Sequence, residues 1–256
     1  MATAHRFSHR AGHSPTRRHR SMQIPRPDVV HTLIARTDER SQPVLAATIA
    51  VAATTGLRRK ELAGLRRSDV DLEHHHLHVR RAIRQDLDGS WIKGAPKTHL
   101  AQRVALDTFT MAVFELVRTK AAAWASDARV AVADENGCVL TLDPSSATPM
   151  RPDTLSQGFA RTCKVAGVDG VSFHPLRHFS AGMLMASGRD VRTIAGRLGH
   201  SDPSTTLRVY ARMIDGRDQD AADFLGALIA PNSRLRSKKA DQLTRYSRPM
   251  AKHPGV

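Results

Sequence analysis

Hydrophobic and polar positions along the chain predict helices that give way to short β segments and then return. Apolar residues recur at helical spacing in residues 28–36, in an Ala- and Val-rich stretch over 43–54, and in a short stretch over 58–65. Gly56 lies between the second and third stretches and breaks the helix there. The pattern therefore predicts that Arg58 lies at the start of a short helix.

From residue 72 to about residue 106 the helical spacing is replaced by short segments typical of β-strands. These segments are LHVRRAI, SWIK and RVAL. Asp88 and Gly89 provide a hairpin turn between the first two, and residues 94–98 provide a second turn. Lys97 is therefore expected on a hairpin turn or at its edge.

The remainder of the chain is predicted to be mainly helical. Gly188, Gly199 and Gly216 separate successive helices, and an irregular stretch covers residues 134–149. The expected helices span residues 108–124, a stretch after Pro152, and residues 174–186, 190–198, 203–213 and 217–230. We predict an α+β fold that is mainly α, with a helical bundle and a small antiparallel sheet near its N-terminal part.

The 256-residue chain is strongly basic, with a net charge of +15 and a pI near 11.0. The excess is concentrated at the ends, since residues 1–20 carry +5 and residues 231–256 carry +6. We expect residues 1–24 and 231–256 to be basic disordered segments that flank one catalytic-type domain over residues 25–230. Such ends are either solvated tails or arms that track the backbone of a polyanion. The charge favours a polyanionic partner, because a protein that neutralises phosphates releases condensed counterions.

Cysteine use and hydropathy argue against a secreted or membrane-bound protein. Cys138 and Cys163 are the only cysteines and have neither metal-ligand nor redox spacing, so both are expected to be buried thiols. The longest mostly apolar stretch, residues 44–57, contains three threonines and is shorter than the roughly 18 residues of a membrane span. We therefore predict a protein of a reduced, cytoplasmic setting with no membrane partner.

Six residues of types that break and reseal phosphodiesters occur in order along the chain. They are Arg58, Lys97, His174, Arg177, His200 and Tyr210. Attack on a phosphodiester requires a nucleophile, neutralisation of charge on the non-bridging oxygens, and a proton for the leaving 5′-oxygen. Arg58 and Arg177 suit a phosphate clamp, because each guanidinium presents a planar fork of donors and stays charged.

The other four residues are candidates for the remaining roles. Tyr210 offers a phenol that must lose its proton during attack, and His174 is the expected acceptor. Lys97 is the expected donor of a proton to the leaving oxygen, and His200 is expected to donate a hydrogen bond to the phosphate. No metal, ATP or other cofactor is required, because covalent capture on the tyrosine conserves the bond energy.

These residues and their surroundings resemble the tyrosine recombinases, or phage-type integrases. The strings that carry the resemblance are TTGLRRKELAGLRRSDVDL from Thr54, APKT around Lys97, HPLRH from His174, and LGHSDPSTTLRVYAR from Leu198. Each motif alone is weak, but their order across about 150 residues is specific. The resemblance implies the tyrosine-recombinase catalytic-domain fold, the roles given above for the six residues, and a 3′-phosphotyrosyl intermediate.

The resemblance also implies a biological assembly and a function. Similar proteins act as homo-tetramers on DNA that exchange one pair of strands and then the other, in some cases with an accessory DNA-bending or excisionase-type protein. The final predicted helix, over residues 217–230, resembles the segment that packs onto a neighbouring subunit. The predicted function is that of a site-specific DNA recombinase, or integrase.

Two features depart from the family's pattern. The helical core-binding domain that precedes the catalytic domain in similar integrases is expected to be absent, because the roughly 30 residues before the first helix are too few to bury a core. Arg67 stands where many relatives have Trp, which affects the packing expected beneath the Arg58 helix. A non-catalytic DNA-binding remnant stays open as an alternative function, and a type IB topoisomerase is ranked third.

Four histidines and two tryptophans are expected to have structural roles and no catalytic or metal-binding role. The histidines are His74, His75, His76 and His78. They lack further ligands at metal-binding spacing and predict an exposed turn that runs into a strand. Trp91 and Trp124 lie in apolar patterns and are expected in the core.

Overall fold

The computed structural model describes residues 24–86, 90–94 and 102–200, together with residues 204, 207, 222, 223 and 225. Lys97 and Tyr210 lie outside these residues, as do the basic tail and all but the last residue of the basic arm. The helices predicted over 203–213 and 217–230 are also largely outside them, although each of the five individually described positions is helical.

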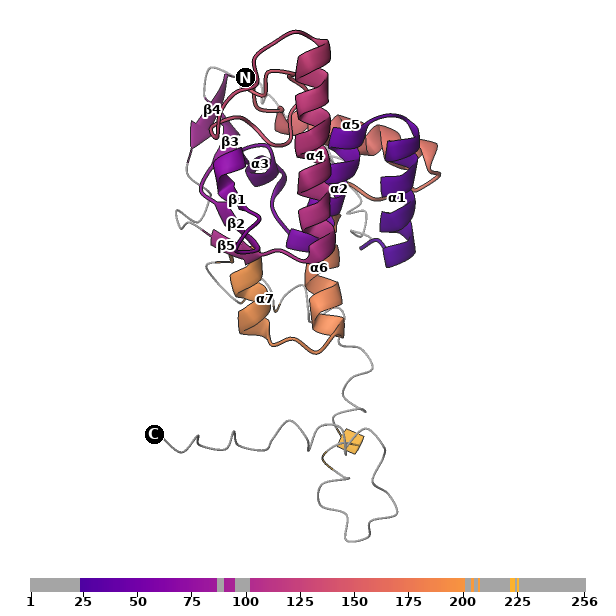
Figure 1. Ribbon diagram of the computed structural model, residues 1–256. Coiled ribbons are helices and arrows are strands. Elements are labelled where there is room, and N and C mark those ends of the chain that lie inside the picture. The colour runs from indigo at the N-terminus through magenta and orange to yellow at the C-terminus, as the bar shows by residue number, and fades with distance from the viewer. Residues whose placement is uncertain are drawn as a thin grey trace, which may run out of the picture.

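The helices of the described fold pack around one central helix, α2. Five helices contact α2 (Pro43–Thr55), namely α1 (Pro27–Glu39), α3 (Arg59–Leu62), α4 (Thr108–Asp127), α5 (Pro152–Val165) and α6 (Pro175–Ala186) (Figure 1). Ten of the thirteen residues of α2 are buried, as expected for a helix that is apolar on every side. This enclosure fixes the end of α2, from which the chain enters the region of Arg58.

Five short strands form two separate antiparallel sheets in the described part of the chain. β1 (Val70–Asp71), β2 (His76–Val79) and β5 (Gln102–Ala105) form one sheet in the order β1-β2-β5, and β3 (Ala82–Gln85) pairs with β4 (Trp91–Gly94) in the other. The expectation of a mainly α fold with a small antiparallel sheet is confirmed, but the strands divide into two sheets where one was predicted. The pairing of β3 with β4 agrees with the predicted hairpin, whose turn at Asp88 and Gly89 lies outside the described residues.

The division into two sheets has a physical cause in a buried carboxylate. Asp69 is fully buried, and its oxygens lie 2.5 Å from Arg81 Nη1 and 3.8 Å from Arg80 Nη1. A buried carboxylate requires such partners. The two arginines lie between β2 and β3, so their pairing with Asp69 interrupts the predicted LHVRRAI segment and assigns its halves to different sheets.

Two short helices lie close to their predicted positions. Arg58 is the residue that precedes α3 (Arg59–Leu62), which confirms that it lies at a helix start. This helix is shorter than the predicted 58–65, because the chain turns at Gly64, where a Cβ would lie 3.1 Å from the carbonyl oxygen of Arg81. α7 (Val191–Leu198) begins after Asp190, whose side chain accepts a hydrogen bond from the Thr193 amide at 2.9 Å.

Arg67 is hydrogen-bonded to the irregular stretch predicted over residues 134–149 and to the residue just before it. It lies in a 3-10 turn, η1 (Arg67–Asp69), and donates from Nη1 to Ala133 O at 2.5 Å and from Nη2 to Ser146 Oγ at 3.1 Å. The stretch itself forms turns and bends with one isolated β-bridge. Arginine at this position therefore has hydrogen-bonding partners of its own.

Other predictions about individual side chains have mixed outcomes. Cys138 and Cys163 are buried thiols, as predicted. His74 lies in an exposed turn that leads into β2, also as predicted. Trp91 packs partly buried against the core, but Trp124 is 40% exposed, so its assignment to the core was wrong. Trp124 instead lines a surface pocket, an environment that apolar spacing does not distinguish from the core.

Candidate active site

Two glycines bring the ends of distant helices together. Gly56 ends α2 with a φ of 69°, and Gly199 ends α7 with a φ of 63°, both in the left-handed region that favours glycine. A Cβ at Gly56 would collide with the side chain of Leu198 and lie 3.3 Å from Ser180 Cβ. Glycine in the TGLR motif thus permits the close approach of α2 to α7, and both turns leave helix carbonyls available to other donors.

Arg177 joins these two helix ends from α6. The residue is buried, and its guanidinium donates from Nη1 to Gly56 O at 2.6 Å and from Nη2 to Leu198 O at 2.5 Å. Burial and, to a smaller extent, the charge of Arg58 lower the pKa of Arg177 to about 10, and Glu61 opposes the change. Arg177 therefore remains a cation at neutral pH. The partial negative charge of helix C-terminal carbonyls helps to stabilise it in place.

Arg58 is held by a carboxylate on the first turn of its own helix. Glu61 is 2% exposed and accepts hydrogen bonds from the Arg58 backbone amide and from Arg58 Nη1, each at 2.8 Å. Arg58 Nη2 also donates to Gly199 O at 3.4 Å. The side chain of Arg58 is 25% exposed, so the guanidinium is fixed in direction and still accessible to an anion.

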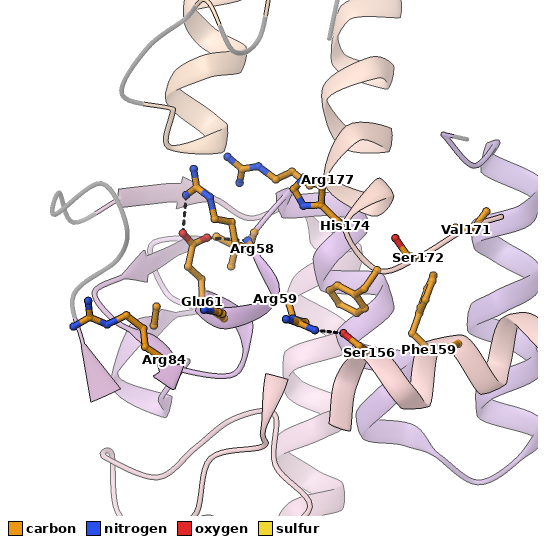
Figure 2. Close-up of a pocket in the computed structure, with 15 residues that line it drawn as sticks. Arg58, Arg59, Glu61, Arg84, Ser156, Phe159, Val171, Ser172, His174 and Arg177 are labelled. Carbon is orange, nitrogen blue, oxygen red and sulfur yellow. Dashed lines mark hydrogen bonds and ion pairs between the residues drawn. The ribbon is translucent and has the colours of Figure 1, made fainter. Parts of the chain in front are cut away.

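The two arginines open onto a basic pocket of about 750 Å³. Figure 2 shows the guanidiniums of Arg58 and Arg177 extending toward each other, with His174 beside them. The charged side chains that line the pocket are Arg58, Arg59, Lys60, Arg84, Arg177 and Glu61. Five cations against one carboxylate leave an excess of positive charge, which suits a polyanion such as a DNA backbone.

Three histidines around the arginines are shifted toward the neutral form. The ring of His174 makes an edge-to-face contact with that of His178, with centroids 4.8 Å apart. Partial burial and the charges of Arg177 and Arg58 lower the pKa of His174, and burial with the neighbouring charges lowers the pKa values of His178 and His200 to about 4. At pH 7 a neutral His174 can accept a proton, and a neutral His200 can donate from one ring nitrogen.

The structure brings together four of the six residues predicted from the sequence. Arg58, His174, Arg177 and His200 come from three segments that are far apart in the chain and interact electrostatically with one another. Lys97 and Tyr210 lie outside the described residues, so their roles stay predictions. Sequence reasoning assigned no role to Glu61, although a glutamate three residues after a helix start is a known capping signal.

Two kinds of feature are absent from the residues that the structure describes. Among the described residues, no group of three or more histidine, cysteine, aspartate or glutamate side chains is arranged to hold a metal ion. Within the same part of the chain, every helix is too short or too polar to cross a membrane.

Comparison of the sequence with known proteins identifies the family. Residues 25–217 match the model of the phage integrase family. The ICEBs1 integrase of Bacillus subtilis is 28% identical over 184 residues, which are 70% of this chain and 48% of that protein. A protein named tyrosine recombinase XerC-like, from Caldanaerobacter subterraneus subsp. tengcongensis, is 30% identical over 196 residues, which are 72% of this chain and 50% of that protein. The chain thus spans about half the length of these curated relatives.

Solved structures of the same kind share the fold. The Tn1549 transposon integrase in complex with transposon right end DNA superposes with a TM-score of 0.63 at 19% identity, covering 73% of this chain and 61% of that one. The XerA recombinase superposes with a TM-score of 0.56 at 21% identity, covering 75% and 64%. The mainly helical fold with small antiparallel sheets is therefore the tyrosine-recombinase catalytic fold. By its family match over residues 25–217, the chain belongs to the phage integrase family.

Proposed function

We propose that the protein is a site-specific DNA strand transferase that cleaves and rejoins DNA through a 3′-phosphotyrosyl intermediate. The observation that carries this proposal is the convergence of two guanidiniums and two neutral imidazoles, from sequence segments around residues 58, 174–177 and 200, beside one basic pocket. Membership of the phage integrase family supports it.

The paired arginines form the phosphate clamp. Glu61 compensates only one of the two positive charges, so a second anion is needed to neutralise the pair. The non-bridging oxygens of a scissile phosphate provide it, and their charge grows as the phosphorus becomes five-coordinate. Donors fixed in advance stabilise such charge strongly, because they do not reorganise during the reaction. His200 contributes a further hydrogen bond to the same phosphate.

The remaining groups transfer protons while the phosphodiester bond is exchanged for a phosphotyrosyl bond. Tyr210 Oη attacks phosphorus, its proton passes to His174, and the bond from phosphorus to the 5′-oxygen breaks. Lys97 gives a proton to that 5′-oxygen, which leaves as a hydroxyl. The reverse steps, with a 5′-hydroxyl of another strand as nucleophile, reseal the DNA and release Tyr210. Because one phosphodiester is exchanged for one phosphotyrosyl ester, no ATP is consumed.

The partners follow from this reaction. The substrate is double-stranded DNA, and residues 25–230 form the catalytic domain, with the basic ends at residues 1–24 and 231–256 acting as arms that contact phosphates. Exchange of two strand pairs requires four active sites, so the active assembly is a homo-tetramer on DNA, with an accessory DNA-bending or excisionase-type protein at its recombination site. Such a protein acts in the cytoplasm at the nucleoid.

Covalent trapping on DNA tests the proposal. The purified chain is incubated with nicked duplexes made from DNA that flanks its own gene, and SDS-resistant adducts are measured. We expect an adduct that is lost in Tyr210→Phe and kept in Tyr246→Phe, which removes the only other tyrosine. Absence of an adduct, even when a core-binding domain of an integrase is supplied, would leave a non-catalytic DNA-binding protein as the better description.

A further inference from the structure

The C-terminal end of α7 anchors side chains from three other parts of the fold. A helix leaves its last carbonyl groups without partners inside the helix, so these groups accept hydrogen bonds from elsewhere. Gln102 Nε2 donates to Arg197 O and, at 3.5 Å, to Gly196 O; Arg177 Nη2 donates to Leu198 O at 2.5 Å; and Arg58 Nη2 donates to Gly199 O at 3.4 Å. Both arginines of the candidate site are thus aligned on one helix end.

The side chain of Arg197 ties this helix end to the rest of the fold. Its Nη1 donates to Ala105 O at the end of β5, and its Nη2 donates to Thr54 O near the end of α2, both at 3.1 Å. Thr54 lies four residues before Arg58. One guanidinium therefore links α7, which carries the Leu198 and Gly199 carbonyls, to the helix end that leads into Arg58.

We propose that Arg197 and Gln102 are positioning residues for the Arg58 and Arg177 clamp. The inference rests on the proposed function. It adds two residues that have no contact with the scissile phosphate and act by fixing the last turn of α7. Two guanidiniums that await a phosphate repel each other, and the partial negative charge of the α7 end offsets that repulsion only if the helix end is held in place.

The geometry explains why arginine is needed at position 197. Its planar fork reaches two carbonyl oxygens on different elements at the same time, which the single ammonium of a lysine does not reproduce. Without this link, the last turn of α7 would be held mainly by Gln102 and by the same two arginines that must bind the phosphate. A shift of about 1 Å in a positioning group is enough to reduce a rate by about 100-fold.

The test compares cleavage of an ordinary phosphodiester with cleavage of a methylphosphonate at the same scissile position. Replacing one non-bridging oxygen by methyl removes the negative charge that the clamp neutralises, so the reaction depends less on the placement of the arginines. We expect Arg197→Met and Gln102→Ala to reduce adduct formation by about 10- to 100-fold on the phosphodiester and by less than about threefold on the methylphosphonate. Arg58→Ala is the reference for a lost clamp residue.

Arg192→Ala is the matched control, because it removes the same charge from an exposed position on the same helix. It is expected to react like the wild type on both substrates. An equal loss for Arg197→Met on both substrates would overturn the proposal, since the variant would then act through the fold as a whole. A third substrate with sulfur in place of the leaving 5′-oxygen needs no proton donor, and rescue there alone would assign the defect to the proton donor and also overturn it.

Hydrogen exchange keeps the inference distinct from the proposed function. The amides of Gly199 and His200 donate to Gly196 O at 3.1 Å and to Ala195 O at 2.9 Å, so their exchange reports on the last turn of α7. We expect exchange at these two amides to be at least about tenfold faster in Arg197→Met than in Arg192→Ala. If the wild type forms no adduct, the proposed function fails, and unchanged exchange would then also reject the positioning role.

Discussion

Replacing Glu61 by glutamine should destabilise the protein and make its stability depend on anions. Glu61 is almost fully buried and holds both the Arg58 amide and Arg58 Nη1 at 2.8 Å. Opposite unit charges about 4 Å apart attract by about 4 kcal/mol at an effective dielectric constant of about 20. Glutamine keeps an acceptor and avoids burying a charge, and Arg58 is partly exposed, so the net loss is smaller, at about 2–3 kcal/mol.

For a domain of this size, a loss of 2–3 kcal/mol lowers the melting temperature by about 5–10 °C. Thermal unfolding in low-salt buffer measures it, with Glu115→Gln as the matched control. Glu115 pairs with Arg118 at the same sequence spacing and at 2.7 Å, but both side chains are exposed, so the control should change stability by less than about 0.5 kcal/mol.

Anions should restore the stability of the Glu61→Gln variant. Once the carboxylate is removed, Arg58 and Arg177 face each other without a compensating anion, and a bound sulfate or phosphate takes its place. Sulfate should therefore raise the melting temperature of Glu61→Gln more than that of Glu115→Gln at equal ionic strength. A Glu61→Gln melting temperature within about 1 °C of the wild type, or no difference between the variants in their response to sulfate, would refute this account of the site.

The other predictions concern pH, backbone geometry and thiol reactivity. His178 and His200 have pKa values near 4 in the folded protein and should stay neutral there, while the unfolded chain takes up protons below about pH 6.5. Their contribution to the free energy of unfolding is therefore complete above about pH 6.5 and is lost as pH falls toward 4, by about 2–3 kcal/mol in total after solvent screening. Urea unfolding from about pH 7.5 to 4.5 measures this loss. Gly56→Ala should lower the free energy of unfolding by about 2–4 kcal/mol, and Gly188→Ala, at a glycine with a similar φ but open space around it, by about 1 kcal/mol. Equal losses in chemical denaturation would contradict the close approach of Gly56 to α7. Burial raises the pKa of Cys163 to about 11, so a thiol reagent at pH 8 should leave it unmodified in the native protein and label it only after unfolding, as peptide mass spectrometry will detect.

Local signals in the sequence predicted the fold well because they reflect short-range chemistry. Proline and glycine at helix ends placed α2, α6 and α7 to within a residue or two of their bounds, and Arg58 was correctly placed at a helix start. Four of the six candidate residues proved to lie together, because the order of short motifs indicates a known arrangement even though each motif alone is weak.

Long-range pairing is what the sequence did not reveal. The buried Asp69 and its arginine partners divide the strands into two sheets, and no local pattern marks a carboxylate for burial. Trp124 shows the same limit, since helical spacing gives a face but not what covers it. The positioning roles proposed for Gln102 and Arg197 rest on contacts across more than 90 residues, and these contacts appear only in the folded structure.

The contacts that assemble the arginine pair also determine when it exists during synthesis. Arg177 reaches Gly56 across 121 residues of chain, and Arg58 reaches Gly199 across 141. At translation rates of about 5–20 residues per second, Gly199 is made about 7–28 seconds after Arg58. A nascent or prematurely terminated chain that stops before residue 199 has Arg58 but lacks the helix end that aligns it with Arg177. Partial products are therefore unable to form the aligned arginine pair.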